Sequence, residues 1–479
     1  MKTGNPFAVD RRSLGLFRIG LGFLIALDLF HKLFLVREFY TDSGVMPRSY
    51  WIQHYMVPMK ISLHLASGEA WWQFLLLGIE LLAALGLMLG LRTRWSAFVA
   101  LLLMCSLQSR NNLILSAADE LMRLMLIWSF FVPASDRFAV DQSNREQEQI
   151  ASPGTAILML QLFSVYIFTA ILKLHPVWTR DFSAIYFALH IDMFATPLAI
   201  WLRQYYRITQ ALTAIVIAWE FAGPLLALLF RGWVRFAAAI GFILFHLSLV
   251  LFFHLGLFPW IAITCWLIYF PTEFWRHPAG AKLERSLDAA FAFLQKVFAQ
   301  ARAPAQPAIH PQRKIQAFAI ALFSLVTLNN LASVNAFALA GELRNAVRFF
   351  YIDQTWNMFA PYPMKNDGWF VIEGQFQNGD KWDLWSGGPV SYEKPDLPSS
   401  AYHSSEWRKF MLQVWDNGSE QILLPFARYL CRRYSEREGL ASNVALIDVI
   451  FIKETTPEPG RPFARPEPVR LWSHDCLKH

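Results

Sequence analysis

Charged residues are scarce in this sequence. Only 16% of its 479 residues are Asp, Glu, Lys or Arg, whereas 55% are hydrophobic. A soluble protein of this size carries about 25% charged residues, so the composition excludes an ordinary soluble protein. Cysteine is scarce too, because the chain has only four, and no Cys-His spacing suggests a metal site. We therefore expect a membrane protein without a metal cofactor.

Two further features are missing. The start, MKTGNPFAVDRRSLGLF, is basic, but no small-residue cleavage site follows a short apolar core. It predicts a cytoplasmic tail and a retained first helix instead of a removed signal peptide. Basic patches interleaved with aromatic residues are missing as well, because the aromatics lie in apolar runs. The net charge of +7 therefore does not indicate a nucleic-acid partner.

Long apolar runs are what the chain has instead. A helix needs about 20 apolar residues to cross about 30 Å of hydrocarbon. The predicted fold class is an all-α polytopic membrane bundle with a small C-terminal extramembrane α+β domain. About nine transmembrane helices are predicted, near residues 14–35, 70–91, 95–115, 119–133, 155–173, 208–230, 236–254, 257–271 and 316–339.

Basic residues give the expected orientation. Lys and Arg are more frequent in the loops that lie on the side of the N-terminus, which is the cytoplasmic side by the positive-inside rule. We expect a bacterial cell inner membrane, with the bundle formed by residues 1–275 and 316–339. Residues 276–315 are predicted to be a cytoplasmic amphipathic helix on the inner leaflet followed by a linker. Residues 340–479 are predicted to be periplasmic.

The C-terminal region has signals of both strands and helices. Asn378-Gly379 lies between WFVIEGQF and KWDLW, and Asn-Gly favours a tight hairpin turn. Helices near residues 404–418 and 421–434 follow, and VALIDVIFI predicts a buried strand. Cys431 and Cys476 both lie in this region, which we place in an oxidising compartment, so they are a candidate disulfide pair.

Ionisable residues inside apolar spans are costly and call for an explanation. Asp28 and Lys32 are four residues apart, as are Asp119 and Arg123. Each pair can form on the face of its own helix, so a structural role explains these residues.

Three other charged residues have no such neighbour: Lys173 in TAILKLHPVW, Glu220 in IVIAWEFAGPLL and Glu80 in LLLGIELLAALG. Each must pair across helices, face water or be neutral. Two explanations stay open. Lys173 can form an ion pair with Glu220 or Glu80 that fixes the packing of the bundle, or it can be a desolvated amine that is partly unprotonated and acts as a base.

Four polar residues have weaker signals. His246 lies on an apolar predicted helix, where a histidine is more often a satisfied core residue than a catalyst. Arg110, Asn111 and Asn112 form a polar elbow between two predicted spans. Capping a tight turn is the simplest role for this elbow, although it lies on the same predicted side of the membrane as Lys173.

Five segments, in this order, resemble the HTTM family: LGLFRIGLGFLIALDL, FYTDSGVMPR, LGLRTR, SRNNLIL and FHLSLVLFFHLGLFPW. The resemblance covers roughly residues 10–275. The family includes the membrane part of the vitamin K-dependent γ-carboxylase. The segment TAILKLHPVW is similar to the carboxylase segment that carries the catalytic lysine, and Lys173 falls on that lysine.

The resemblance implies a specific reaction. In the carboxylase, the lysine amine deprotonates a reduced naphthoquinone, and oxygen then converts the quinol into a strong base and finally an epoxide. That base removes a γ-proton from a substrate glutamate before carbon dioxide adds. For this chain the resemblance implies a reduced, vitamin K-like quinone as cofactor and Lys173 as the base. From their predicted burial in the bundle, Glu220 and Glu80 are expected to set the charge state of this lysine. The residues expected around the substrate are Glu80, Arg110, Asn111, Asn112, His175, Trp178 and His246.

One position departs from the family pattern, because Leu113 stands where the carboxylase has a functional histidine after two asparagines. Several hypotheses therefore remain. The first is a carboxylase-like oxidoreductase or lyase that uses a quinol. The second is a non-enzymatic partner that helps to mature or export a peptide or protein, with the external tail as its docking surface. The third is a lipid- or quinone-binding protein without turnover. Membrane lipid and a peptide or protein on the external face are the expected partners.

Overall fold

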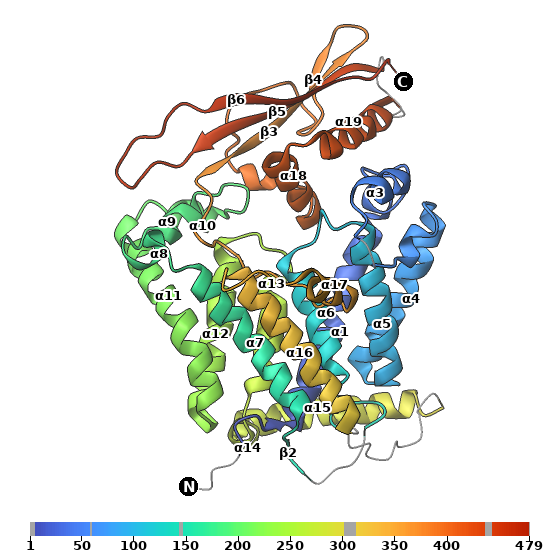
Figure 1. Ribbon diagram of the computed structural model, residues 1–479, viewed down its shortest axis with the longest axis vertical. Helices are drawn as coiled ribbons and strands as arrows, with labels where there is room; N and C mark the ends of the chain where they lie inside the picture. The colour runs from blue at the N-terminus through green and yellow to red at the C-terminus, as the bar shows by residue number, and fades with distance from the viewer. Residues whose placement is uncertain (1–4, 58–59, 143–146, 301–312, 436–442, 479) are drawn as a thin grey trace.

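The computed structural model describes residues 5–57, 60–142, 147–300, 313–435 and 443–478. The chain forms a helical bundle with a four-stranded sheet at one end (Figure 1). At the opposite end, α15 (Pro278–Val297) lies across the bundle, and β1 (Val9–Asp10) pairs with β2 (Gln149–Ile150). The predicted linker, residues 301–314, lies almost wholly outside the described residues.

Six helices among the described residues are long and apolar enough to cross a membrane: α1 (Arg11–Leu33), α4 (Ala70–Leu89), α7 (Pro153–Leu172), α11 (Tyr206–Leu229), α12 (Gly232–Phe252) and α16 (Arg313–Ser333). Large apolar side chains on their outer faces are exposed, for example Leu82 of α4, which is 71% exposed. Such surfaces are expected where lipid surrounds a helix, so the chain is a multi-pass membrane protein.

The prediction of nine spans is not confirmed. The third, fourth and eighth predicted spans form α5 (Thr93–Arg110), α6 (Ala117–Ser129) and α13 (Phe258–Trp266), which are shorter than the six helices above. From Leu121 to Trp128 every residue of α6 is buried, so protein surrounds this helix. A helix buried inside a bundle is as apolar as a lipid-facing one, and hydropathy alone does not separate them.

Short helices connect or extend the long ones: α2 (Val36–Phe39), α3 (Arg48–His54), η1 (Leu63–Leu65), α8 (Pro176–Thr179), α9 (Ala184–Leu189), α10 (Pro197–Leu202), η2 (Leu267–Tyr269), α14 (Thr272–Arg276), α17 (Gly341–Phe349) and η3 (Pro398–Ala401). The helix predicted to lie on the inner leaflet is α15. Its Leu283 and Leu287 pack against Phe138 and Trp275 of the bundle, so protein covers part of the apolar face that was expected to meet lipid.

The C-terminal sheet is antiparallel, with the strand order β4-β3-β5-β6. Its strands are β3 (Asn366–Phe376), β4 (Lys381–Asp383), β5 (Val444–Thr455) and β6 (Glu467–Asp475). The predicted hairpin turn joins β3 to β4, and Gly379 has a φ of +90°, a conformation that favours glycine. Helices α18 (Ser405–Asn417) and α19 (Glu420–Ser435) lie between this sheet and the bundle (Figure 1).

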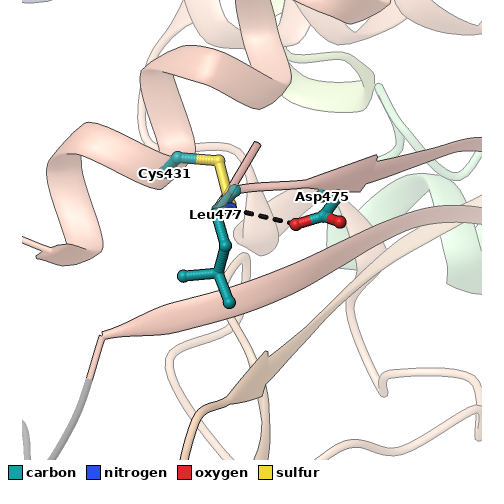
Figure 2. Close-up of a disulfide and its surroundings, with 4 residues drawn as sticks. Cys431, Asp475 and Leu477 are labelled. Atoms are coloured by element: carbon teal, nitrogen blue, oxygen red, sulfur yellow. Dashed lines mark hydrogen bonds between the residues drawn. A yellow bond between two sulfur atoms is a disulfide. The ribbon is translucent and has the colours of Figure 1, made fainter. Parts of the chain in front are cut away.

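A disulfide joins α19 to the end of β6. Figure 2 shows the bond between Cys431 of α19 and Cys476, the residue that follows the strand. The two cysteines are 45 residues apart in the sequence, and their Cα atoms are 5.7 Å apart. Next to the bond, Leu477 donates its backbone N–H to the Asp475 carboxylate. The bond therefore fixes α19 against the end of β6.

Candidate functional site

Lys173 is the residue after α7, and it meets Glu220 of α11. Its Nζ lies 2.7 Å from Oε1 and 2.8 Å from Oε2 of Glu220. Each of the two side chains is only 5% exposed. Of the two partners that the sequence leaves open for Lys173, the structure shows Glu220. Removing one partner of such a pair would leave the other charge buried without compensation.

A proline places Lys173 at a helix end. Helix α7 stops at Leu172, and α8 begins at Pro176 with His175 as its N-cap. Because proline has no N–H and disfavours a helical residue before it, α7 does not continue into α8. Lys173 Nζ lies 4.6 Å from the centroid of the Trp178 ring, which is a cation–π distance. The ammonium is therefore covered by a carboxylate and an indole.

Trp178 and His175 connect this pair to the segment that follows α17. The indole N–H of Trp178 donates to the backbone oxygen of Phe359 at 3.2 Å. The His175 ring lies 4.9 Å from the ring of Tyr362. Phe359 and Tyr362 in turn line a large cavity, whereas Lys173 is not part of its lining. The ion pair thus lies behind one wall of this cavity.

The outer cavity, as we name it, has a volume of about 480 Å³ and lies between the bundle and α18. Small-molecule sites have volumes of about 300–1,000 Å³, so the outer cavity is large enough for a ligand. Part of its wall is apolar and includes Phe194, Leu257, Phe258, Met358 and Leu412. The rest is charged and includes Asp28, Lys32, Asp119, Glu120, Glu406, Arg408 and Lys409.

Three residues of the bundle form a charged network on this wall. Lys32 Nζ donates to Asp28 at 2.6 Å and to Asp119 at 3.0 Å. The predicted pair of Asp28 and Lys32 on one helix is therefore confirmed. The predicted pair of Asp119 and Arg123 is wrong. Arg123 donates at 2.8 Å to two backbone oxygens of the segment after α17, because that segment lies against α6 while Asp119 faces α1.

Glu80 lies on α4 and belongs to the same region. Its side chain is buried, and the charges that act on it are those of Lys32 and Asp28. Among the described residues, its Oε2 has no hydrogen-bond partner. The structure therefore does not bring Glu80 to Lys173.

The polar elbow between α5 and α6 forms hydrogen bonds with the backbone at the end of α2 and just after it. Arg110 is fully buried and donates to two backbone oxygens of the segment after α2. Asn111 donates to the backbone oxygen of the last residue of α2. Asn112 is exposed and lines a separate cavity of about 350 Å³. Leu113, at the position of the family histidine, is buried in the apolar core. These contacts match the structural role that the sequence favours for the elbow.

His246 is a buried residue of α12 with a hydrogen-bonded neighbour. Its Nε2 lies 2.6 Å from the hydroxyl of Tyr166, which accepts a hydrogen bond from the indole of Trp266. Tyr166 belongs to α7, about two helical turns before Lys173. In the described part of the chain, His246 Nδ1 has no hydrogen-bond partner. The geometry is that of a core histidine, and it does not place His246 beside Lys173.

Helix α18 adds residues that the sequence does not assign to any site. Glu406 lies 3.2 Å from Nε2 of His31 on α1. Burial by itself would raise the pKa of Glu406, but the hydrogen bond with His31 and the charge of Lys32 lower it to about 2. Arg408 and Lys409 line the outer cavity. The segment SSEWRKFMLQVW predicts a helix, but nothing in it shows that this helix docks on the bundle.

Comparison with known proteins gives one match. The family described as HTTM domain matches residues 7–275, which is more than half of the chain. No curated protein and no solved structure matches. The matched region contains the helices from α1 to α13, and with them Lys173, Glu220 and the bundle side of the outer cavity. The chain is a member of the HTTM domain family.

Proposed function

We propose that this chain is a carboxylase-like membrane oxidoreductase or lyase that uses a reduced quinone, and that Lys173 and Glu220 handle the quinol proton. The observation that carries the proposal is the buried pair of Lys173 and Glu220. It lies at the position that resembles the catalytic lysine of the γ-carboxylase. An ionisable residue inside a membrane bundle is by default a candidate functional residue, and its partner here is known.

The pairing changes the roles expected from the sequence. A lysine without a partner would itself be the base. In the ion pair, the carboxylate of Glu220 is the group that can accept a proton, and the ammonium of Lys173 stabilises the anion that remains. A reduced quinone, when bound, supplies an acidic hydroxyl and reducing electrons. Glu220 would accept the hydroxyl proton of that quinone, and Lys173 would hold a positive charge beside the oxygen that loses it.

Aromatic rings surround the pair, and a substrate would have to reach it through the wall that separates it from the outer cavity. The Trp178 ring lies over the ammonium, and the His175 and Tyr362 rings are in contact close by. Both partners of the pair are withdrawn from water. Electrostatic interactions are stronger in such a site than in water, so the ammonium can stabilise a quinol anion effectively.

We propose a bacterial inner membrane as the location, with the sheet at the periplasmic end and α15 at the cytoplasmic end. The distribution of basic residues supports this orientation. The disulfide supports it too, because such bonds persist in oxidising compartments and are rare in the cytosol. The sheet and α15 lie at opposite ends of the bundle, as this orientation requires (Figure 1).

The direct test uses the purified full chain in nanodiscs with a reduced naphthoquinone, oxygen and bicarbonate. Epoxide is measured by mass spectrometry, and carbon fixation is measured on added glutamate peptides. We expect epoxide from the wild type and a loss of about 10²–10⁴-fold in Glu220→Gln, the range typical of a lost general base. Lys173→Met should lose a comparable amount. Lys60→Met, which breaks an ion pair with Asp353 outside the site, is the control and should keep the rate.

A second function is binding without turnover. It is favoured because Lys173 Nζ bonds both carboxylate oxygens of Glu220. In that case the pair only fixes helix packing, and the outer cavity and the C-terminal sheet domain bind a partner. The double variant Lys173→Met/Glu220→Met separates the two functions, because apolar residues of similar volume often replace a buried pair without loss of stability. A folded double variant that keeps the wild-type epoxide rate, or a wild type that forms no epoxide, would exclude the enzymatic function.

A further inference from the structure

Two consecutive cations of α18 face the outer cavity, and neither has a carboxylate partner in the part of the chain that the structure describes. Arg408 is only 7% exposed and donates to the backbone oxygens of His254 and Ser399, each at 3.3 Å. Its Nε has no hydrogen-bond partner among the described residues. Lys409 lines the same cavity, and no described carboxylate lies within ion-pair distance of its Nζ.

The acidic groups of the cavity are engaged elsewhere. Asp28 and Asp119 share the ammonium of Lys32. Glu406 interacts with His31 and accepts a hydrogen bond from the neighbouring Ser405 hydroxyl. Glu120 accepts the backbone N–H of Thr355. Among the described residues, none of these carboxylates lies within ion-pair distance of Arg408 or Lys409, so both cations keep N–H donors that a ligand can use.

Burial makes these cations costly. It lowers the pKa of the Lys409 ammonium, although the charges of Asp119, Glu120 and Asp416 oppose the shift. Burial also lowers the pKa of Arg408. An anion that pairs with both cations would offset the loss of hydration, and this gain is available only on binding.

The two cations differ in how firmly they are held. The Arg408 guanidinium lies 5.9 Å from the ring of Phe194 and 5.5 Å from the ring of Tyr402. Together with its two backbone acceptors, these rings fix the side chain in place. Lys409 makes no such contact with the described residues and is partly exposed. Lys409 is therefore the better residue to vary, because its loss does not disturb the docking of α18.

We propose that the outer cavity binds an amphiphile with a single carboxylate head group, which pairs with Lys409 and Arg408. The apolar wall formed by Phe194, Leu257 and Phe258 receives the tail. A single negative charge fits better than a doubly charged phosphate, because the carboxylates of Asp119 and Glu120 line the same cavity as Lys409. This site goes beyond the proposed function and does not depend on any chemistry at Lys173.

The test uses the full chain in nanodiscs of zwitterionic lipid. The probes are decanoate, decanol and decyltrimethylammonium, and binding is measured by calorimetry and by the shift of the unfolding temperature. A ligand that binds only the folded state raises that temperature. We expect decanoate to bind at least tenfold more tightly than the other two probes. Its affinity should fall at least tenfold in Lys409→Gln and persist in Lys409→Arg.

Two controls make the result specific. Lys453→Gln removes another partly buried lysine of the same region, on β5, and should leave decanoate binding unchanged. Lys173→Met/Glu220→Met should also bind decanoate like the wild type, so a failure of the proposed enzymatic function and a failure of this site give different results. The unfolding temperature of Lys409→Gln without ligand shows whether the variant is folded.

Any of three results would overturn the proposal. The first is equal affinity for decanoate and decanol, and the second is unchanged decanoate affinity in folded Lys409→Gln. The third is tighter binding of decyl phosphate than of decanoate, which would contradict the choice of head group. The pH dependence gives a further check. Decanoate affinity should fall as pH rises through the lowered pKa of Lys409, below the value of about 10.4 of an ordinary lysine.

Discussion

Lys173 is buried and Lys409 is half-buried, and the two lysines differ in what faces them. Lys173 is held by both carboxylate oxygens of Glu220 and lies over the Trp178 ring. Lys409 faces a cavity and has no ion-pair partner among the described residues. Burial alone therefore does not define the role of a lysine. The partner decides whether the charge stabilises the fold or is left to bind a ligand.

The two environments also have different origins. The partner of Lys173 comes from another helix of the bundle, so this contact exists wherever the bundle is folded. Lys409 comes from α18, and its position depends on the docking of the C-terminal region onto the bundle. Variants at the Lys173 site should therefore affect mainly the stability of the bundle. Variants at Lys409 should affect mainly ligand binding.

The largest expected effect comes from Glu220→Leu. This change leaves the Lys173 ammonium buried without its carboxylate, which should lower the free energy of unfolding by about 3–5 kcal/mol. Unfolding is measured in mixed micelles. Lys173→Met/Glu220→Leu should recover most of this loss, because the isolated charge is gone. Equal stability of the single and the double variant would show that the unpaired ammonium of Lys173 is not what destabilises Glu220→Leu.

Removing the disulfide should have the next largest effect. Cys431→Ser/Cys476→Ser opens a loop between residues 45 positions apart, and such losses typically cost about 2–4 kcal/mol. Because the bond lies in the C-terminal region, decanoate affinity should fall with it, whereas the Lys173 site should be unaffected. If the double serine variant unfolds like the wild type and binds decanoate equally well, this expectation is contradicted.

A helix cap tests the docking of α18 more gently. The Ser404 hydroxyl accepts the backbone N–H of Trp407 at 3.2 Å and so caps the helix that carries Lys409. Ser404→Ala should cost about 1 kcal/mol. Thermal unfolding measures this cost, and Ser404→Asp, which keeps a capping acceptor, should restore the stability. If alanine and aspartate behave alike, the cap does not hold α18.

The smallest effect is expected for Lys409→Met. Losing an ammonium that has no ion-pair partner among the described residues should change the free energy of unfolding by less than about 1 kcal/mol. The sign should favour the variant, because desolvation of the charge is relieved. The same substitution at Lys173 should destabilise the protein clearly. A loss at Lys409 as large as that at Lys173 would mean that Lys409 has a partner in the folded protein.

The sequence predicts those parts of the structure that depend on local chemistry. Asn378-Gly379 produces the hairpin turn, and Ser404 and Gly418 begin and end α18 as the sequence indicates. Because no acid lies near Lys173 in its own helix, an ion pair across helices is one of two explanations that the sequence leaves open. The structure shows such a pair.

What the sequence does not predict depends on packing between distant segments. Nothing local distinguishes Glu220 from Glu80 as the partner of Lys173. Asp119 has Arg123 one turn away, yet it pairs with Lys32 because α1 and α6 meet at that point. The docking of α18, which brings Arg408 and Lys409 to the bundle, leaves no pattern in the sequence. Hydropathy likewise does not separate the buried α6 from a membrane span.

Infrared difference spectroscopy of the wild type, on addition of a reduced naphthoquinone without oxygen, measures directly where the quinol proton goes. If the Lys173–Glu220 pair takes the proton, a band of a newly protonated carboxyl group should appear in the wild type and be missing in Glu220→Gln. A spectrum without such a band, or a band that persists in Glu220→Gln, would contradict the proposed role of the pair.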